Sequence, residues 1–171
     1  MTLIVEDGTG KPDAESYAAI TDADLYNKNF NNGSASWSNL AGTQKEVALR
    51  LATQYIDTSY SFLGSPLLPA SQSLQFPRVG LLGYTAQQPM PWPVRNLTQA
   101  TCELAMRAAN GPLFNDQSSA DVRREQVGPI SVEYFGEIMN GQTTYTIVDK
   151  LLSPFTGGLS GSINIGLERG A

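Results

Sequence analysis

The stretch that decides the fold is PVRNLTQATCELAMRAAN, residues 93 to 110. Its apolar positions recur every three or four residues, which is the spacing of one face of an α-helix: Val94, Leu97, Thr101, Leu104, Ala105 and Ala108. Pro93 suits the first helical position, where its missing N–H needs no partner, and Gly111 predicts a left-handed stop. Four alanines in the stretch would let neighbours approach closely, so we predict the central core helix here.

A second strong helix is predicted from Gly42 to about Tyr60. Thr43 and Glu46 have the spacing of a capping box at its start. Its apolar stripe would comprise Val47, Ala48, Leu51, Ala52, Tyr55 and Ile56. We expect Leu51 and Leu104 to be buried, each facing the other's helix.

Two weaker helices complete the prediction. One lies within residues 16–32, with Thr21 as its cap, and the other spans residues 144–152. Before them, residues 3–5 form a short strand-like run that is followed by a turn. The fold class is therefore mainly α: a small bundle of about four helices with a β-hairpin and extended N- and C-terminal arms.

The hairpin is predicted at residues 122–135. Alternating apolar and polar residues flank Gly128 and Pro129 there, which is typical of two antiparallel strands around a turn. Arg123 and Arg124 begin the first strand. Adjacent arginines are ordinarily solvated, but they could also clamp a partner's acidic surface.

A long loop and a tail carry the other candidate contacts. Residues 61–92 contain five prolines and no helical periodicity, and the sequence FPRVG places Arg78 at the tip of a compact turn. Residues 1–153 would form one helical domain that includes this loop. Residues 154–171 would form a flexible docking tail whose apolar anchors are Phe155, Leu159, Ile163, Ile165 and Leu167.

Composition excludes several classes of function. The 171 residues include 16 acids and 11 bases, a net charge of −5, which disfavours wrapping of duplex DNA. There is no histidine, and Cys102 is the only cysteine, so we expect no enzyme, cofactor or metal site. No apolar run reaches the length of a membrane span, and MTLIVEDGTG lacks the basic start of a secretion signal. We expect synthesis in the cytoplasm of a host cell.

Four passages carry a resemblance: MTLIVEDGTGKPDAESY, FPRVG, ATCELAMRA and VGPISVEY. Together they resemble the DnaT-like single-stranded DNA-binding family of small tailed-phage proteins, over nearly the whole length. Such proteins are similar to head–tail connectors, or adaptors, that lie beneath the portal.

The resemblance implies a structural virion protein at the head–tail interface, in a homo-oligomeric ring of twelve. Its partners would be the portal protein, a neck or tail protein and its own copies. The packaged DNA would pass through the ring without sequence-specific binding, and no membrane would be involved.

The family name implies the alternative function, binding of single-stranded DNA. That function requires a basic groove with interleaved aromatic residues, whereas the bases here are scattered and outnumbered. We favour the connector, and Arg78, Arg123 and Arg124 are the first DNA contacts to test under the alternative. An enzyme is a distant third hypothesis, because no lysine or carboxylate base lies at a motif spacing from a serine or cysteine.

Overall fold

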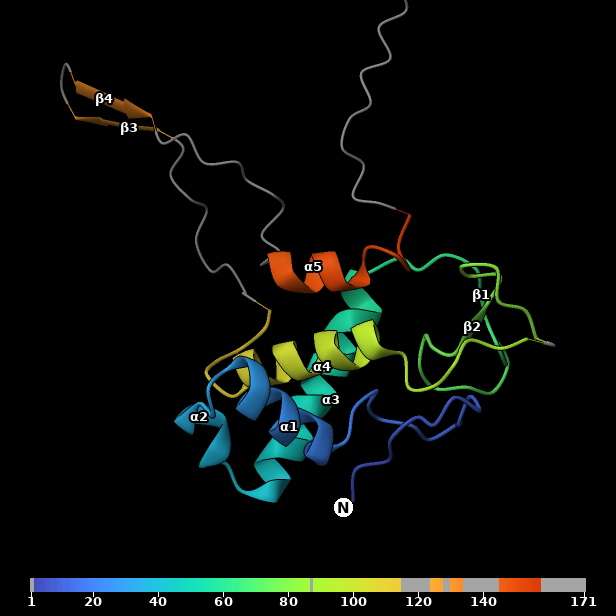
Figure 1. Cartoon of the computed structure of the whole chain (residues 1–171). Coiled ribbons are helices and arrows are strands. Elements are labelled where there is room, and N and C mark those ends of the chain that lie inside the picture. The colour runs from blue at the N-terminus through green and yellow to red at the C-terminus, as the bar shows by residue number, and fades with distance from the viewer. Residues whose placement is uncertain (1, 87, 115–123, 128–129, 134–144, 158–171) are drawn as a thin grey trace, which may run out of the picture.

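The structure, a computed structural model, describes residues 2–86, 88–114, 124–127, 130–133 and 145–157. Its helices are α1 (Ile20–Phe30), α2 (Ala35–Ser38), α3 (Gly42–Ser59), α4 (Arg95–Ala108) and α5 (Thr146–Leu152). Its strands are β1 (Ser65–Pro66), β2 (Arg78–Val79), β3 (Arg124–Val127) and β4 (Ile130–Glu133). The predicted fold class, mainly α with a hairpin, is confirmed (Figure 1).

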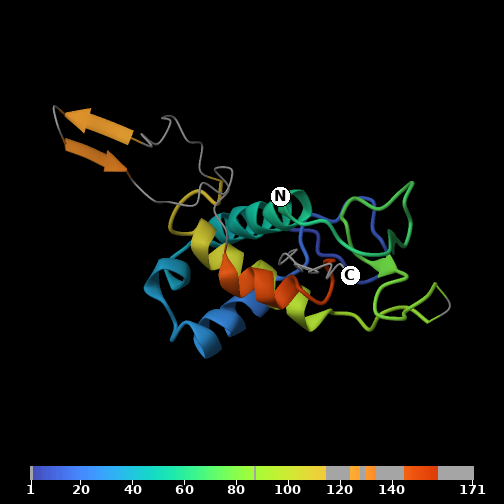
Figure 2. The same cartoon turned by 90° about the horizontal axis from the view of Figure 1, so that it is seen from above.

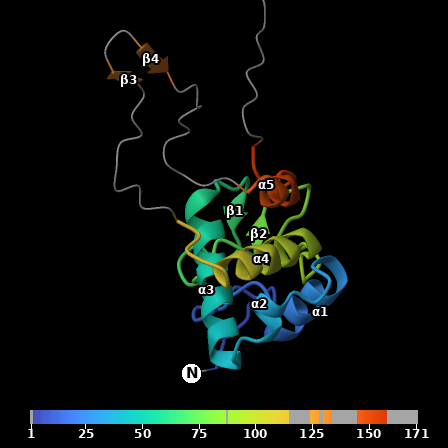
Figure 3. The same cartoon turned by 90° about the vertical axis from the view of Figure 1, so that its left-hand side faces the viewer.

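Helix α4 is the centre of the bundle, as predicted. Helices α1, α3 and α5 all pack against it, and α4 lies between α3 and α1 (Figures 2 and 3). Its buried residues are mostly small: Leu97, Ala100, Thr101, Cys102, Leu104, Ala105 and Met106. Close approach on several sides requires such small side chains, because a bulky one would hold a neighbouring helix away.

The ends of α4 differ from the prediction. The helix begins at Arg95, with Val94 rather than Pro93 at its boundary. Gly111 is not a left-handed stop, because it is not among the glycines with a positive φ. Asn110 ends the helix instead: its side-chain amide donates to the Met106 carbonyl at 2.9 Å, which satisfies a terminal acceptor.

The face that α3 buries is rotated from the predicted one. Leu104 is fully buried, but Leu51 is 42% exposed and Val47 is 51% exposed, so the expected Leu51–Leu104 contact is wrong. The buried residues of α3 are Ala48, Leu49, Ala52, Thr53, Tyr55 and Ile56. Apolar residues surround much of this helix, so periodicity alone left its rotation about its own axis ambiguous.

The predicted caps are also displaced. At the start of α3, the Ala41 N–H donates to Gln44 Oε1 at 2.9 Å, and Glu46 instead faces Arg50 at 3.6 Å. At the start of α1, the Ala19 N–H donates to Asp22 Oδ2 at 2.9 Å. In both helices a side-chain oxygen accepts the backbone N–H of the N-cap residue three positions earlier. This is half of a capping box, because the N-cap residue is Ala rather than Ser or Thr.

A buried carboxylate organises the N-terminal turn. Glu6 is almost fully buried, and its side chain accepts backbone N–H groups from Asp7, Gly8, Gly10 and Lys11. These donors compensate for the loss of hydration of the charge. The predicted strand-like run before it forms only one bridge, between Val5 and Ser16.

Two short antiparallel pairs complete the architecture. The loop at residues 61–92 contains no helix, as predicted, and within it β1 pairs with β2. The predicted hairpin is confirmed, with Arg124 opposite Glu133 and Val127 opposite Ile130. In Figures 1 to 3 the strands β3 and β4 lie apart from the helices.

The burial of α4 gives a first prediction. Leu104→Ala should lower the free energy of unfolding by about 2–5 kcal/mol, because it leaves a cavity beside three helices. Leu51→Ala is the matched control and should lower it by no more than about 1 kcal/mol, because Leu51 is 42% exposed and its truncation leaves no enclosed cavity. Urea denaturation measures both. Equal losses in the two variants would contradict the observed rotation of α3.

Candidate partner-binding surfaces

Arg78, a predicted interface residue, lies inside the protein. Only 7% of it is exposed, and its guanidinium makes five hydrogen bonds to the chain. The acceptors are the carbonyls of Phe62, Leu63, Gly64 and Gln75, and Gln75 Oε1, at 2.8–3.2 Å. Because a guanidinium has five N–H donors, none remains for a partner. Arg78 therefore holds the long loop together.

A tyrosine–aspartate pair ties the same loop to the core. The Tyr17 hydroxyl donates to Asp57 Oδ1 at 2.5 Å and accepts the Phe76 N–H at 3.2 Å. Asp57 also accepts the Gln75 N–H at 3.1 Å. Burial raises the pKa of Asp57 to about 6, although the Tyr17 hydrogen bond favours its charged form.

An aromatic cluster closes the root of the hairpin segment. Phe114 and Tyr145 are the described residues on either side of this segment, and the Tyr145 hydroxyl donates to the Leu113 carbonyl at 3.2 Å. The ring of buried Tyr55 lies 5.0 Å from that of Phe114 and 5.4 Å from that of Tyr145. Both ends of the segment are thereby held beside α3.

A second aromatic cluster anchors the start of the C-terminal tail. Phe155 is buried, with its ring 5.7 Å from that of Phe76. The Leu63 N–H donates to the Phe155 carbonyl at 2.9 Å, and Thr156 bridges Phe62. Phe155, predicted as a docking anchor of the tail, is therefore a core residue, and the compact domain extends at least to Thr156.

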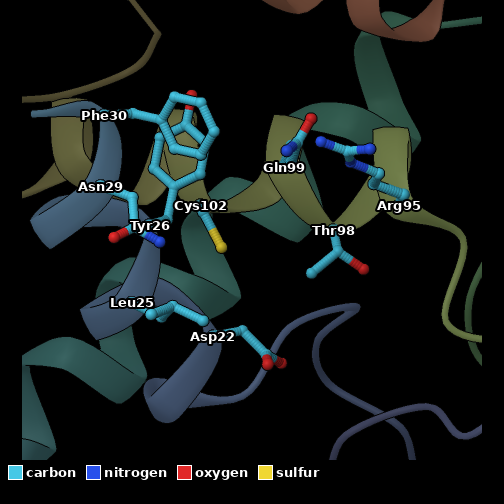
Figure 4. Close-up of a pocket in the computed structure, with 9 residues that line it drawn as sticks. All are labelled: Asp22, Leu25, Tyr26, Asn29, Phe30, Arg95, Thr98, Gln99 and Cys102. Carbon is cyan, nitrogen blue, oxygen red and sulfur yellow. The ribbon is translucent and has the colours of Figure 1, made fainter.

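A groove of about 320 Å³ separates α1 from α4. Leu25, Phe30 and Arg95 lie along it, and the Phe30 ring is stacked on that of Tyr26 at 4.8 Å (Figure 4). Leu25 and Phe30 are each 59% exposed. Buried Cys102 also lines the groove. Such exposed apolar side chains on two adjacent turns are typical of a surface that receives a partner.

Four of the nine lysines and arginines in the described segments have acidic partners. The pairs are Lys11–Asp7 at 3.0 Å, Lys45–Asp24 at 2.7 Å, Arg50–Glu15 at 2.8 Å and Arg107–Glu103. These pairs neutralise charges that an electrostatic groove for nucleic acid would need. Arg78 is buried as well, so five of the nine described cations are engaged within the protein.

Of the other predicted interface residues, the structure describes only Arg124. Arg124 is in β3, but Arg123 and the tail residues Leu159, Ile163, Ile165 and Leu167 lie outside the described residues. Sequence reasoning missed the α1–α4 groove and the cluster around Tyr55. The stacking of Tyr26 on Phe30 could have been predicted from the sequence, since residues four apart are neighbours on the surface of a helix. The Tyr55 cluster could not, because it joins residues distant in the chain.

The comparisons identify a family. The profile of the family described as "Putative DnaT-like ssDNA binding protein" matches residues 1–170. The chain belongs to this family. No curated protein and no solved structure matches it.

In this family member, the described segments contain no cluster of metal-binding side chains. No helix among them is long and apolar enough to cross a membrane. The described residues do display the anchors at Tyr145 and Phe155 and the groove between α1 and α4.

The role of Arg78 can be tested by Arg78→Lys. An ammonium group has three donors, so at least two buried acceptors would lose a partner, which should lower the free energy of unfolding by about 2–5 kcal/mol. Arg95→Lys is the matched control on the groove surface and should change it by less than about 0.5 kcal/mol. An unchanged urea midpoint for Arg78→Lys would show that Arg78 does not hold the loop.

The pKa of Asp57 predicts a pH-dependent stability. Because its pKa is about 6 when folded and about 4 when unfolded, the folded state binds more protons between these values. Stability due to this group should therefore fall by about 1 kcal/mol as the pH rises from 5 to 7. Asp57→Asn should remove that loss, so its stability relative to the wild type should rise over this range.

Asp7→Asn is the control for the pH series. Hydrogen bonds from Thr9 and Lys11 lower the pKa of Asp7 to about 2, so this group stays charged between pH 5 and 7. Its difference from the wild type should be constant there. Urea titrations at pH 5, 6 and 7 measure both variants. A constant difference for Asp57→Asn as well would show that the buried pair does not titrate in this range.

Proposed function

We propose that this protein is a head–tail connector of a tailed-phage virion. In this role it forms a ring beneath the portal, extends the DNA channel and joins the capsid to a neck or tail protein. Copies of the chain, the portal and the tail-side protein are its partners. It is a structural protein of the virion and catalyses no reaction.

The observation that supports this proposal is the pair of anchored roots. Tyr145 lies directly before α5 and Phe155 shortly after it, so these two anchors flank the same helix. Phe155 is buried, and Tyr145 and Phe155 are both hydrogen-bonded to the core. A core that fixes the anchors of two segments is suited to binding large neighbours, since only the segments need to adapt to the partner.

The distribution of charge supports a passive role toward DNA. Acids outnumber bases, and four of the nine lysines and arginines in the described segments are already paired with acids. A ring with such a surface would not retain the duplex through phosphate contacts. DNA could then pass through it during ejection.

Binding of single-stranded DNA is the second candidate, and the family description supports it more directly than it supports a connector. One structural observation favours it. Exposed Phe30 stacks on Tyr26 in a groove that also contains Arg95, and aromatic faces beside a cation bind unpaired bases. Asp22 lines the same groove and would repel phosphates. We therefore keep this function second.

A truncation tests the connector. Removal of residues 158–171 leaves the described root at Phe155 intact, so the purified protein should unfold at an unchanged temperature. It should nevertheless fail to join phage particles when it replaces the full chain during assembly. Mass spectrometry of purified particles measures its incorporation.

Two outcomes would count against the connector. Normal incorporation of the truncated protein would show that the tail makes no essential contact. Submicromolar, salt-sensitive binding of a single-stranded oligonucleotide, lost in Phe30→Ala, would favour the second candidate. Lys28→Ala is a suitable control for that loss, because it removes an exposed cation of the same helix outside the groove.

A further inference from the structure

A tight turn within the long loop has Leu82 and Gly83 as its two central residues. The Tyr84 N–H donates to the Leu81 carbonyl at 2.9 Å, and the Gly80 N–H donates to the Tyr84 carbonyl at 2.8 Å. The φ angles of Leu82 and Gly83 are +50° and +82°. Positive φ at both central positions is a property of the type I′ turn, which joins two antiparallel segments through only two residues.

Leucine is an unfavourable residue for the first central position of this turn. In a left-handed backbone its Cβ crowds the following carbonyl, whereas glycine, asparagine and aspartate adopt this conformation readily. The other non-glycine residue with a positive φ in the described segments is Asn32, which fits this rule. The backbone at Leu82 is therefore strained, and the geometry of the turn does not explain why a leucine is there.

Packing within the subunit does not explain Leu82 either. Its neighbour Leu81 anchors the turn and is 1% exposed, whereas Leu82 is 60% exposed. Among the described residues, Leu82 belongs neither to the core nor to the partly buried side chains packed against it. Strand β2, which leads into the turn, lies at the end of the molecule opposite α2 (Figures 1 and 2). An apolar side chain is thus displayed to solvent despite backbone strain, which indicates a contact outside the subunit.

We propose that Leu82 is an anchor that inserts into an uncharged apolar pocket of a neighbouring virion protein other than a copy of this chain. This inference rests on the proposed connector and deepens it by assigning one of its contacts. A hydrogen-bonded turn presents such an anchor with little further loss of conformational entropy. Residues 79–94 contain no charged side chain, although 16% of the residues of the chain are charged. Leu82 can therefore enter a dry pocket without burying an ion of its own segment.

The chemistry around Leu82 selects a pocket of another protein over other occupants. A nucleic acid would require cations beside the turn, and residues 79–94 supply none. A lipid surface would require a larger apolar area than one leucine or a basic patch, whereas the chain has a net charge of −5. A second copy would offer the two described pockets, but charged residues line both of them.

Leu82→Asn tests the anchor, because it should stabilise the subunit and weaken its assembly. Asparagine relieves the backbone strain, so the urea midpoint should rise and the unfolding equilibrium constant should fall about threefold. Loss of the apolar side chain should lower incorporation into phage particles at least about tenfold when the variant replaces the wild type during assembly. Mass spectrometry of purified particles measures incorporation. A leucine kept for its own fold would not give effects of opposite sign.

Two variants serve as controls. Leu82→Met keeps an apolar side chain on the same backbone, so its urea midpoint and its incorporation should both stay near those of the wild type. Leu68→Asn changes a leucine of the same loop that is 43% exposed and is not among the residues with a positive φ. It should not raise the urea midpoint, and it should leave incorporation unchanged.

Any of three results would overturn the inference. These are normal incorporation of Leu82→Asn, an unchanged or lower urea midpoint for that variant, and an equal loss of incorporation in Leu68→Asn. Failure of the connector gives a different result. A wild-type chain that is absent from purified particles would refute the connector, and with it the partner assigned to Leu82. Incorporation of both the wild type and Leu82→Asn would refute the anchor alone.

Discussion

The structure depends on the requirement that α4 be packed on several sides at once. Helices α1, α3 and α5 contact it, and close approach of three neighbours is feasible only because its buried surface is built largely from small residues. A larger residue at Ala100 or Ala105 would separate a neighbour from the bundle. The hairpin root contacts α3, the tail root follows α5, and the groove lies beside α1. The positions of all three features therefore depend on the packing of these helices against α4.

Outside the helices, hydrogen bonds from buried side chains to the backbone hold irregular segments in place. Glu6 collects four backbone N–H groups in the N-terminal turn, and Arg78 donates five hydrogen bonds in the long loop. Trp92 joins the two segments, since its Nε1–H donates to the Glu6 carbonyl at 2.9 Å. Gly8, with φ of +93°, lies against the same indole, where a Cβ would be 2.8 Å from Trp92 Cβ. Each of these buried side chains needs all of its hydrogen-bond partners, because losing some of them would leave a buried polar group unsatisfied. The requirement fixes the backbone of both segments without helix or sheet.

The sequence allowed α1, α3, α4, α5, the hairpin and the central place of residues 93–110 to be predicted, because periodicity and turn residues are local signals. The four-residue helix α2 was not predicted. The sequence did not allow the rotation of α3 to be predicted, since apolar residues lie on too many sides of that helix. Arg78 was predicted at the tip of the FPRVG turn, and no local pattern in the sequence indicates the five acceptors that the fold places around it. The α1–α4 groove and the Tyr55 cluster arise from residues far apart in the chain. Only folding brings them together.

The closed root of the hairpin segment has an evolutionary consequence. Because the rings of Phe114 and Tyr145 both contact that of Tyr55, the two ends of the intervening segment are fixed next to each other. The closure entropy of a loop with fixed ends changes only slowly with its length. This arrangement of the ends is therefore compatible with intervening segments of different lengths.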